Sequence, residues 1–354
     1  MSELTMRRLP TLCRRCFPAA LVLVSSLVLS STARAEPDIL ARVKKQGFVR
    51  CAVDFTPGFS SIDQNGRHQG FDTDFCRAIA AAALGDANAI RLERVSLTYK
   101  FQALAAGDID VAMGMTTWTY KRDTGTGAAF TMPTYFDGQS FLVWSDSPYT
   151  SPDKLKGVTV CARRDSTSVG TLLEYDKRLK LGVKIVEANS IEDRIGRFTK
   201  RECEVMTGDR TELELTRLRY SGIHTINRWR VLPGVISREP IGPYVAAHDP
   251  RWNAIVRWVI NVTQIAELRS ITSNTIASIG AEADGELRRL AGLEGDFGKS
   301  LGLKDDWARQ VIAQVGNYGE IFDRNIGVDS PFSLERGPNR PTSSGGYFFP
   351  PPLR

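Results

Sequence analysis

The stretch that decides the fold runs from Gly70 to Gly85, with the sequence GFDTDFCRAIAAAALG. Its apolar residues Phe75, Ile79 and Ala83 recur at the spacing of one helix face. Asp72 is a residue type that caps helix starts, and a glycine ends the stretch. We therefore expect a helix that begins at Asp72 and closes at the glycine.

Short apolar runs flank this helix, and the alternation continues along the chain. Residues 48–53 and 90–95 are expected to be strands on its two sides, and a third strand is expected at 108–113. Further helices are expected at 39–45 and 100–106. Strands that alternate with helices indicate a parallel sheet covered on both faces.

The same pattern then restarts, which predicts a second α/β lobe. Its expected elements are strand 158–161, helix 166–177, strand 184–186, helix 191–199 and strand 204–207, followed by a long helix at 251–266. Residues 337–354 are rich in Pro, Gly and Ser and are expected to lie extended on the surface. A chain of 354 residues also exceeds one ordinary core, which favours two domains.

Residues 1–35 have the plan of a secretory signal peptide. Basic residues precede an apolar run at 17–29, and Ala33-Arg34-Ala35 is a small-residue cleavage site. Arg14-Arg15 also loosely resembles a twin-arginine signal, so the export route stays open. The full chain has 46 basic and 40 acidic residues, and removal of the leader's five Arg and one Glu leaves 41 minus 39, or +2. Because this balance offers no basic surface, we expect no nucleic-acid partner. Outside the leader, no apolar stretch is long enough to span a bilayer, so we also expect no stable membrane insertion.

Four cysteines remain in the exported chain: Cys51, Cys76, Cys161 and Cys203. An oxidising compartment permits disulfides, and their positions favour the pairs 51–76 and 161–203, one in each lobe. Four cysteines allow three connectivities, and reduced, buried cysteines are the other alternative.

Several segments together resemble the general L-amino-acid-binding proteins of ABC transporters. The segments are Gly58-Phe59-Ser60, residues 70–76 (GFDTDFC), Thr116-Thr117-Trp118-Thr119 with Arg122-Asp123, and residues 314–327 (QVGNYGEIFDRNIG). The resemblance implies the α/β type II periplasmic-binding fold, with two lobes joined by two crossing strands. It places residues 36–136 and 245–354 in lobe one, with the tail 337–354, and 137–244 in lobe two. It also implies a periplasmic, monomeric protein that delivers a free L-amino acid to a permease in the inner membrane.

An amino acid carries a carboxylate and an ammonium, and each needs a partner when it is buried. In the family pattern the carboxylate is gripped by an Arg of lobe one, which matches Arg122, and the ammonium by an Asp of lobe two, which matches Asp209. Thr117 would add a backbone N–H and a hydroxyl, and the carbonyl of Met115 would meet the ammonium. The bland alternatives are a surface ion pair for Arg122 and, for Asp209, a helix cap or a pair with the next residue.

The remaining candidate residues come from a helix start and from aromatic side chains. Ser166 and Thr167 open the helix at 166–177, where free N–H groups favour an anion, and Thr167 matches the family's carboxylate donor. Both are alternatively no more than helix caps. Phe55, Phe59 and Trp118 are expected to line the side-chain pocket or to pack in the core.

The chain departs from the family pattern at three places in this region. Gly114-Met115 replaces an Arg-Asn pair, and Arg163-Arg164-Asp165 replaces Gln-Ala-Gly. Asp165 would cap the following helix. The loop 54–58 is about one residue shorter than usual. These departures predict a shifted or narrower ligand range.

Enzyme motifs find little support in the sequence. His68, His224 and His248 are far apart and lack metal-ligand spacing, and no Gly-x-Ser-x-Gly motif is present. We expect no catalytic residue, metal or cofactor. The alternatives that stay open are an exported dehydratase of cyclic acids on the same fold and an amino-acid sensor that docks on a receptor instead of a permease.

Overall fold

The computed structural model describes residues 38–221 and 228–354, so the predicted signal peptide and His224 lie outside the described residues. The chain divides into the units Met1–Ala35 and Glu36–Arg354, and only the second is considered below. Within the described residues, every helix is too short or too polar to cross a membrane.

The first sheet has the strand order β4-β1-β5-β14-β6. Its strands are β4 (Ile90–Arg94), β1 (Val49–Val53), β5 (Val111–Ala112), β14 (Tyr244–Ala246) and β6 (Ala128–Phe130). β1 is parallel to β4 and β5, while β14 is antiparallel to β5 and β6. Because Tyr244 pairs with Ala112 and Phe130, the lobe boundary that we placed between residues 244 and 245 falls inside β14.

The second sheet has the strand order β10-β9-β11-β8-β12. Its strands are β10 (Lys184–Ala188), β9 (Thr159–Arg163), β11 (Val205–Asp209), β8 (Gln139–Trp144) and β12 (Trp229–Val231). β9 is parallel to β10 and β11, and β8 runs antiparallel between β11 and β12. Each sheet therefore has three neighbouring parallel strands, then one antiparallel strand, and then an edge strand that pairs antiparallel with it.

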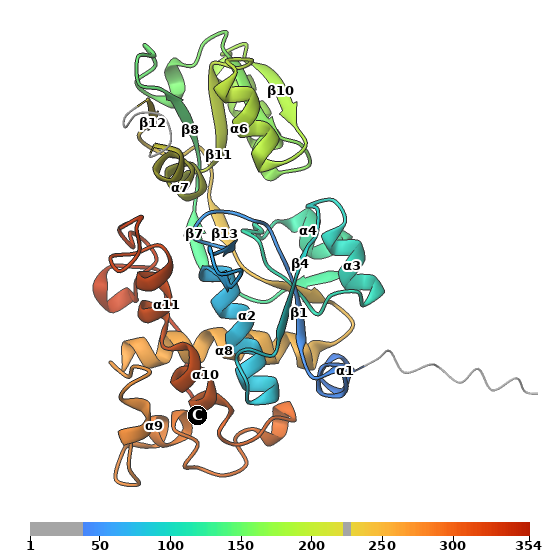
Figure 1. The fold of residues 1–354 in the computed structure, drawn as a ribbon, viewed down its shortest axis with the longest axis vertical. Helices are drawn as coiled ribbons and strands as arrows, with labels where there is room; N and C mark the ends of the chain where they lie inside the picture. The colour runs from blue at the N-terminus through green and yellow to red at the C-terminus, as the bar shows by residue number, and fades with distance from the viewer. Residues whose placement is uncertain (1–37, 222–227) are drawn as a thin grey trace, which may run out of the picture. The chain divides into compact units, whose positions relative to one another are not determined.

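Two antiparallel strands connect the parts of the chain that form these sheets. β7 (Tyr135–Asp137) leads out of the first sheet, and β13 (Glu239–Ile241) leads back to it, with Phe136 opposite Pro240. Figure 1 shows β7 and β13 side by side between the two sheets. This is the two-strand crossover of a type II periplasmic-binding fold.

Helices cover both sheets and follow the strands that the sequence pattern predicts. The α-helices are α1 (Ile39–Gln46), α2 (Phe71–Leu84), α3 (Lys100–Ala106), α4 (Tyr120–Gly125), α5 (Thr167–Leu179), α6 (Ile191–Thr199), α7 (Arg210–Ser221), α8 (Pro250–Leu268), α9 (Gly285–Leu290), α10 (Trp307–Val315) and α11 (Tyr318–Asn325). The short 3-10 helices are Pro152–Lys154, Ile276–Ser278, Lys299–Leu301 and Thr342–Ser344, and a small hairpin joins β2 (Ser61–Ile62) to β3 (His68–Gln69).

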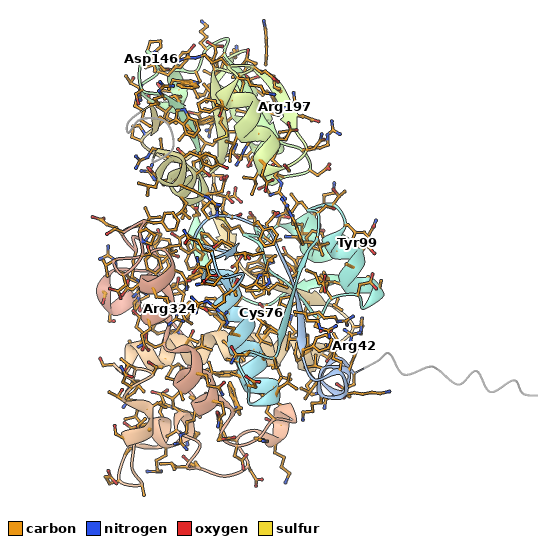
Figure 2. All side chains as sticks on the ribbon, viewed as in Figure 1. Arg42, Cys76, Tyr99, Asp146, Arg197 and Arg324 are labelled. Carbon is orange, nitrogen blue, oxygen red and sulfur yellow. A yellow bond between two sulfur atoms is a disulfide. The ribbon has the colours of Figure 1, made fainter. Side chains whose placement is uncertain are left out.

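Helix α2 forms the centre of the first lobe and is buried along almost its whole length. Its second half is a run of apolar residues, mostly alanine, and its buried polar residues Asp72 and Asp74 lie in the first turn, where they bond to neighbouring segments. It begins one residue earlier than expected, with Gly70 at the N-cap, so the prediction that Asp72 caps it was wrong. Arg324, labelled in Figure 2, reaches from α11 to Asp74 of α2, with Nε 2.8 Å from the carboxylate.

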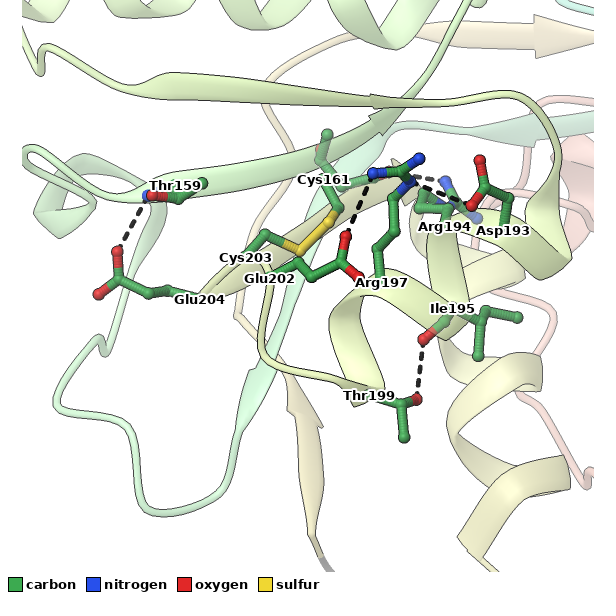
Figure 3. Close-up of a disulfide and its surroundings, with 11 residues drawn as sticks. Thr159, Cys161, Asp193, Arg194, Ile195, Arg197, Thr199, Glu202, Cys203 and Glu204 are labelled. Carbon is green, nitrogen blue, oxygen red and sulfur yellow. Dashed lines mark hydrogen bonds and ion pairs between the residues drawn. A yellow bond between two sulfur atoms is a disulfide. The ribbon is translucent and has the colours of Figure 1, made fainter.

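Both predicted disulfides are present, one in each lobe. Cys51 of β1 joins Cys76 of α2, and Cys161 of β9 joins Cys203 in the turn before β11. Figure 3 shows the second bond beside Arg197, which pairs with Asp193 and with Glu202. Each disulfide therefore ties an inner strand of its sheet to a later segment of the same lobe.

The C-terminal segment departs from the expected extended surface tail. Leu353 is fully buried, and Phe348 packs 4.7 Å from the ring of Tyr318. Asn339 bonds both the N–H and the carbonyl of Phe136 in β7. The composition of residues 337–354 correctly indicated that long helices and strands are absent there. The buried side chains of Phe348 and Leu353 nevertheless pack this segment against lobe one.

Candidate ligand-binding site

A pocket lies where the parallel strands of both sheets end. Asp54 follows β1, Met115 follows β5, Arg163 ends β9 and Asp209 ends β11, and all four line the same pocket. Ligand sites of open α/β sheets characteristically occur at the carboxyl ends of parallel strands. The βαβ alternation of the sequence therefore positions the site.

The pocket brings together all six residues that we expected to meet the main-chain groups of a ligand. Its lining includes Met115, Thr117, Arg122, Ser166, Thr167 and Asp209. The first three belong to the first lobe and the last three to the second. Their common location is an observation, and their contacts with a ligand stay a prediction.

Arg122 lies in α4, and its guanidinium has spare donors. Nη1 donates to the carbonyl of Thr117 at 3.0 Å, and within the described residues no carboxylate lies at ion-pair distance from it. Burial lowers the pKa of Arg122, although an arginine stays charged at any physiological pH. An accessible guanidinium with unused N–H groups is suited to a planar carboxylate.

Asp209 offers the opposite charge from the second lobe. Among the described side chains, none forms a hydrogen bond or ion pair with its carboxylate, and Arg210 pairs instead with Glu214. Burial, followed by the neighbouring carboxylates of Asp137 and Glu239, raises the pKa of Asp209 well above its usual value. A cationic ligand group would relieve this repulsion.

A buried ion pair stands beside Asp209. Arg194 of α6 pairs with Glu212 of α7, and both side chains are less than a tenth exposed. Arg194 also donates to the carbonyl of Thr207. Gly208 leaves room for this pair, because a Cβ there would lie 2.5 Å from Nη1 of Arg194. Because Arg194 and Glu212 neutralise each other, the carboxylate of Asp209 has no ion-pair partner among the described residues.

The start of α5 forms the second-lobe wall. Ser166 is the N-cap in backbone geometry, but its hydroxyl donates to the carbonyl of Arg163 at 2.6 Å and caps no N–H. Asp165 does not cap the helix either, since it accepts from the hydroxyl of Thr98 in the first lobe. The first N–H groups of α5 therefore lack a side-chain cap and border the pocket.

The first-lobe floor is held by Asp72. Its carboxylate accepts the N–H of Gly114 at 2.9 Å and that of Met115 at 3.2 Å, which fixes Met115 in the left-handed region at φ 46°. Burial raises the pKa of Asp72 to about 6. Lys100 completes the floor from below, donating to the carbonyl of Met113 and to Thr116.

Gly114 cannot be replaced without moving this floor. A Cβ there would lie 2.9 Å from the backbone nitrogen of Asp54 and 3.2 Å from Nζ of Lys100, and its φ is 83°. Lys100 is fully buried, and burial lowers its pKa to about 8. A side chain at position 114, such as the arginine of the family pattern, would therefore require Asp54 and Lys100 to move.

An ion pair crosses the pocket from one lobe to the other. Arg163 donates to Asp54 at 2.6 Å, and each side chain is 15% exposed. Both residues lie at strand ends, so the pair joins the carboxyl edges of the two sheets. Arg163 is one of the residues by which the sequence departs from the family pattern.

Residues 49–291 match the model of the bacterial extracellular solute-binding proteins, family 3. The chain belongs to this family. It is 37% identical over 317 residues to the putative amino-acid ABC transporter-binding protein YhdW of Escherichia coli K12, covering 89% of this chain and 92% of the relative. It is 36% identical over 339 residues to the general L-amino acid-binding periplasmic protein AapJ of Rhizobium johnstonii, covering 95% and 97%.

A solved relative has the same fold over most of the chain. It is an ABC transporter periplasmic binding protein from Brucella ovis with glutathione bound, 34% identical to this chain. The TM-score is 0.86, with 90% of this chain and all of the relative's chain covered. The resemblance that the sequence motifs indicated is thus confirmed for family and fold.

The aromatic side chains of this family-3 solute-binding protein do not line the pocket as expected. Phe59 is fully buried, with Phe71 and Tyr135 in edge contact at 5.5 and 5.4 Å, so its assignment to the pocket was wrong. Trp118 stacks on Phe130 at 4.8 Å, Phe55 lies under the guanidinium of Arg94, and neither is among the residues that line the pocket. Core packing, the alternative that we had left open, accounts for Phe59.

Three polar features of the site were missed in the sequence. Arg194 lies on the apolar face of α6 with Ile191 and Ile195, and a charge on such a face is the signal that could have found it. The burial of Lys100 and the pairing of Asp54 with Arg163 left no such signal, because each depends on contacts between distant segments. Within the described residues, no group of side chains is arranged to hold a metal ion.

Proposed function

We propose that this protein captures a free L-amino acid between its lobes and delivers it to the permease of an ABC transporter. The observation that carries the proposal is the pocket itself, in which Arg122 and Asp209 come from different lobes and neither has an ionic partner among the described residues. A zwitterion supplies the counter-charge for each. The names of the curated relatives support the same ligand class.

The charges also suggest how the ligand would act on the protein. A carboxylate on Arg122 and an ammonium on Asp209 belong to one small molecule, so both contacts form only when the lobes approach. Ligand binding would then shift the population toward the closed form. We propose that the chain is exported to the periplasm after cleavage near Ala35 and acts there as a monomer.

The test is a thermal-shift screen of the exported chain, begun at Glu36. We expect L-amino acids to raise Tm, since stabilisation follows the logarithm of ligand concentration over Kd. D-amino acids and simple dicarboxylates should not, because they misplace or lack the ammonium. The screen includes glutathione, which the Brucella ovis relative binds.

Hits are then measured by calorimetry, and each is incubated with the protein and analysed for turnover. Binding without chemical change supports the transport function. A screen in which no L-amino acid or amino-acid derivative binds would refute the proposal. Conversion of a cyclic acid would favour the enzyme alternative.

A further inference from the structure

A second cavity adjoins the pocket at the Asp54–Arg163 ion pair. Asp54, Leu97 and Arg163 line both spaces. The second cavity measures about 540 Å³, against about 50 Å³ for the pocket itself. The ion pair is therefore a partition between a small pocket and a larger annex, by which we mean this second cavity.

The annex is lined by charged residues, among which one arginine is mostly buried. Three guanidinium groups line it, those of Arg94, Arg163 and Arg164, against the two carboxylates of Asp54 and Asp165. Arg94 and Arg164 are half exposed and pair with glutamates, whereas Arg163 is mostly buried and faces both spaces. A largely desolvated guanidinium makes the stronger contact with a carboxylate.

Arg163 can bind another carboxylate in place of Asp54, because Asp54 then still has a cation nearby. Asp54 and the ammonium of Lys100 both lie against Gly114, where an added Cβ would be 3.2 Å from Cβ of Asp54 and 3.2 Å from Nζ of Lys100. Lys100 donates to carbonyl and hydroxyl oxygens and has no carboxylate at ion-pair distance within the described chain. Asp54 therefore keeps a cation nearby when a ligand carboxylate takes its place on Arg163.

We propose that the pocket and the annex form one ligand site, in which Arg163 binds a second carboxylate of the ligand. The ligand class is an L-amino acid whose side chain is extended to a terminal carboxylate, as in a γ-glutamyl dipeptide. This inference rests on the proposed function, which places the α-amino-acid end between Arg122 and Asp209. The distal carboxylate then displaces Asp54 at the partition.

The experiment compares γ-L-glutamylglycine with its C-terminal amide, and uses glutamine as the reference ligand. Calorimetry on the exported chain is expected to give at least about tenfold tighter binding of the acid than of the amide, the size of one added charged hydrogen-bonded contact. Arg163→Gln is expected to reduce this ratio to about twofold or less. Arg163→Lys should give an intermediate ratio, because it keeps the charge but loses the bidentate geometry.

Arg91→Gln is the matched control, since Arg91 is an exposed arginine of β4 that stacks on Phe48 outside both cavities. It should keep the full ratio. The inference is overturned if wild-type protein binds acid and amide equally, or if Arg163→Gln keeps the preference. If glutamine binds but γ-L-glutamylglycine binds no more tightly than its C-terminal amide, only this inference fails. If none of the three ligands binds wild-type protein, this inference is overturned, and the proposed function fails with it only if the thermal-shift screen also finds no L-amino acid or amino-acid derivative that binds.

Discussion

Each end of the pocket has one arginine and one aspartate, but within the described chain the two charges are unpaired at one end and form an ion pair at the other. At one end, Arg122 and Asp209 face the pocket without ionic partners among the described residues. At the other end, Asp54 and Arg163 already form an ion pair at 2.6 Å. The first end gains a partner when a ligand enters, whereas at the second a ligand must compete with a protein group.

This difference predicts that the first end determines overall affinity, whereas the second end determines selectivity between ligands. The unpaired charges of Arg122 and Asp209 contribute binding energy to every ligand that carries an α-carboxylate and an α-ammonium. A pre-formed pair contributes only when the ligand offers a better partner, so it discriminates between ligands that share the same head. Removing the charge of Arg122 should therefore weaken ligand binding, whereas removing the charge of Asp54 should strengthen the binding of a ligand that carries a second carboxylate.

The largest expected effect is at the unpaired end. Arg122→Gln should weaken the binding of a free L-amino acid by about a hundred- to several-thousand-fold, because the buried ligand carboxylate loses a contact of about 3–5 kcal/mol. Calorimetry with the best ligand of the screen measures the change. A variant that binds within a few-fold of wild type would show that the carboxylate is held elsewhere.

A smaller effect is expected from pH. Burial and nearby carboxylates raise the pKa of Asp209, and burial raises that of Asp137 to about 6. The ligand ammonium favours the ionised form of Asp209, so binding releases protons, and affinity should fall as pH decreases from about 8 to about 5. Asp209→Asn should bind more weakly at the higher pH and show a flatter profile. An equal slope in both proteins would exclude Asp209 as the titrating group.

The smallest effect, and one of the opposite sign, is expected at the paired end. Asp54→Asn removes the competitor of the ligand carboxylate and should tighten the binding of γ-L-glutamylglycine by about three- to tenfold. Calorimetry against the C-terminal amide provides the comparison. Weaker binding of the acid would mean that Asp54 orients Arg163 and does not compete for it.

Local signals predicted most of the regular structure. The helices expected at 100–106 and 191–199 occur residue for residue, because each has an apolar face and a clear stop. The strand expected at 108–113 is only Val111–Ala112, because the backbone N–H of Arg50 in β1 donates to the carboxylate of Asp110 and not to a carbonyl of this strand. Such a difference arises from contacts that a local pattern does not contain.

The site shows the same division. Arg122 and Asp209 were found through ordered motifs, and the structure brings them to one pocket. The Asp54–Arg163 pair joins residues 109 positions apart, so no local pattern could predict it. Phe59 was misplaced because an aromatic residue beside a binding motif has the same local signal whether it faces the ligand or the core.

Helix α2 has a consequence for the energetics of capture. Its disulfide to Cys51, its bonds from Arg324 and Asn325 to Asp74, and the bonds of Asp72 to the Met115 loop fasten one rigid rod to three parts of the first lobe. The floor of the pocket is therefore assembled before any ligand arrives. Little conformational entropy therefore remains to be lost at the floor when a ligand binds. Substitutions that loosen α2 at its disulfide or at Asp74 should weaken ligand binding, although these residues do not line the pocket.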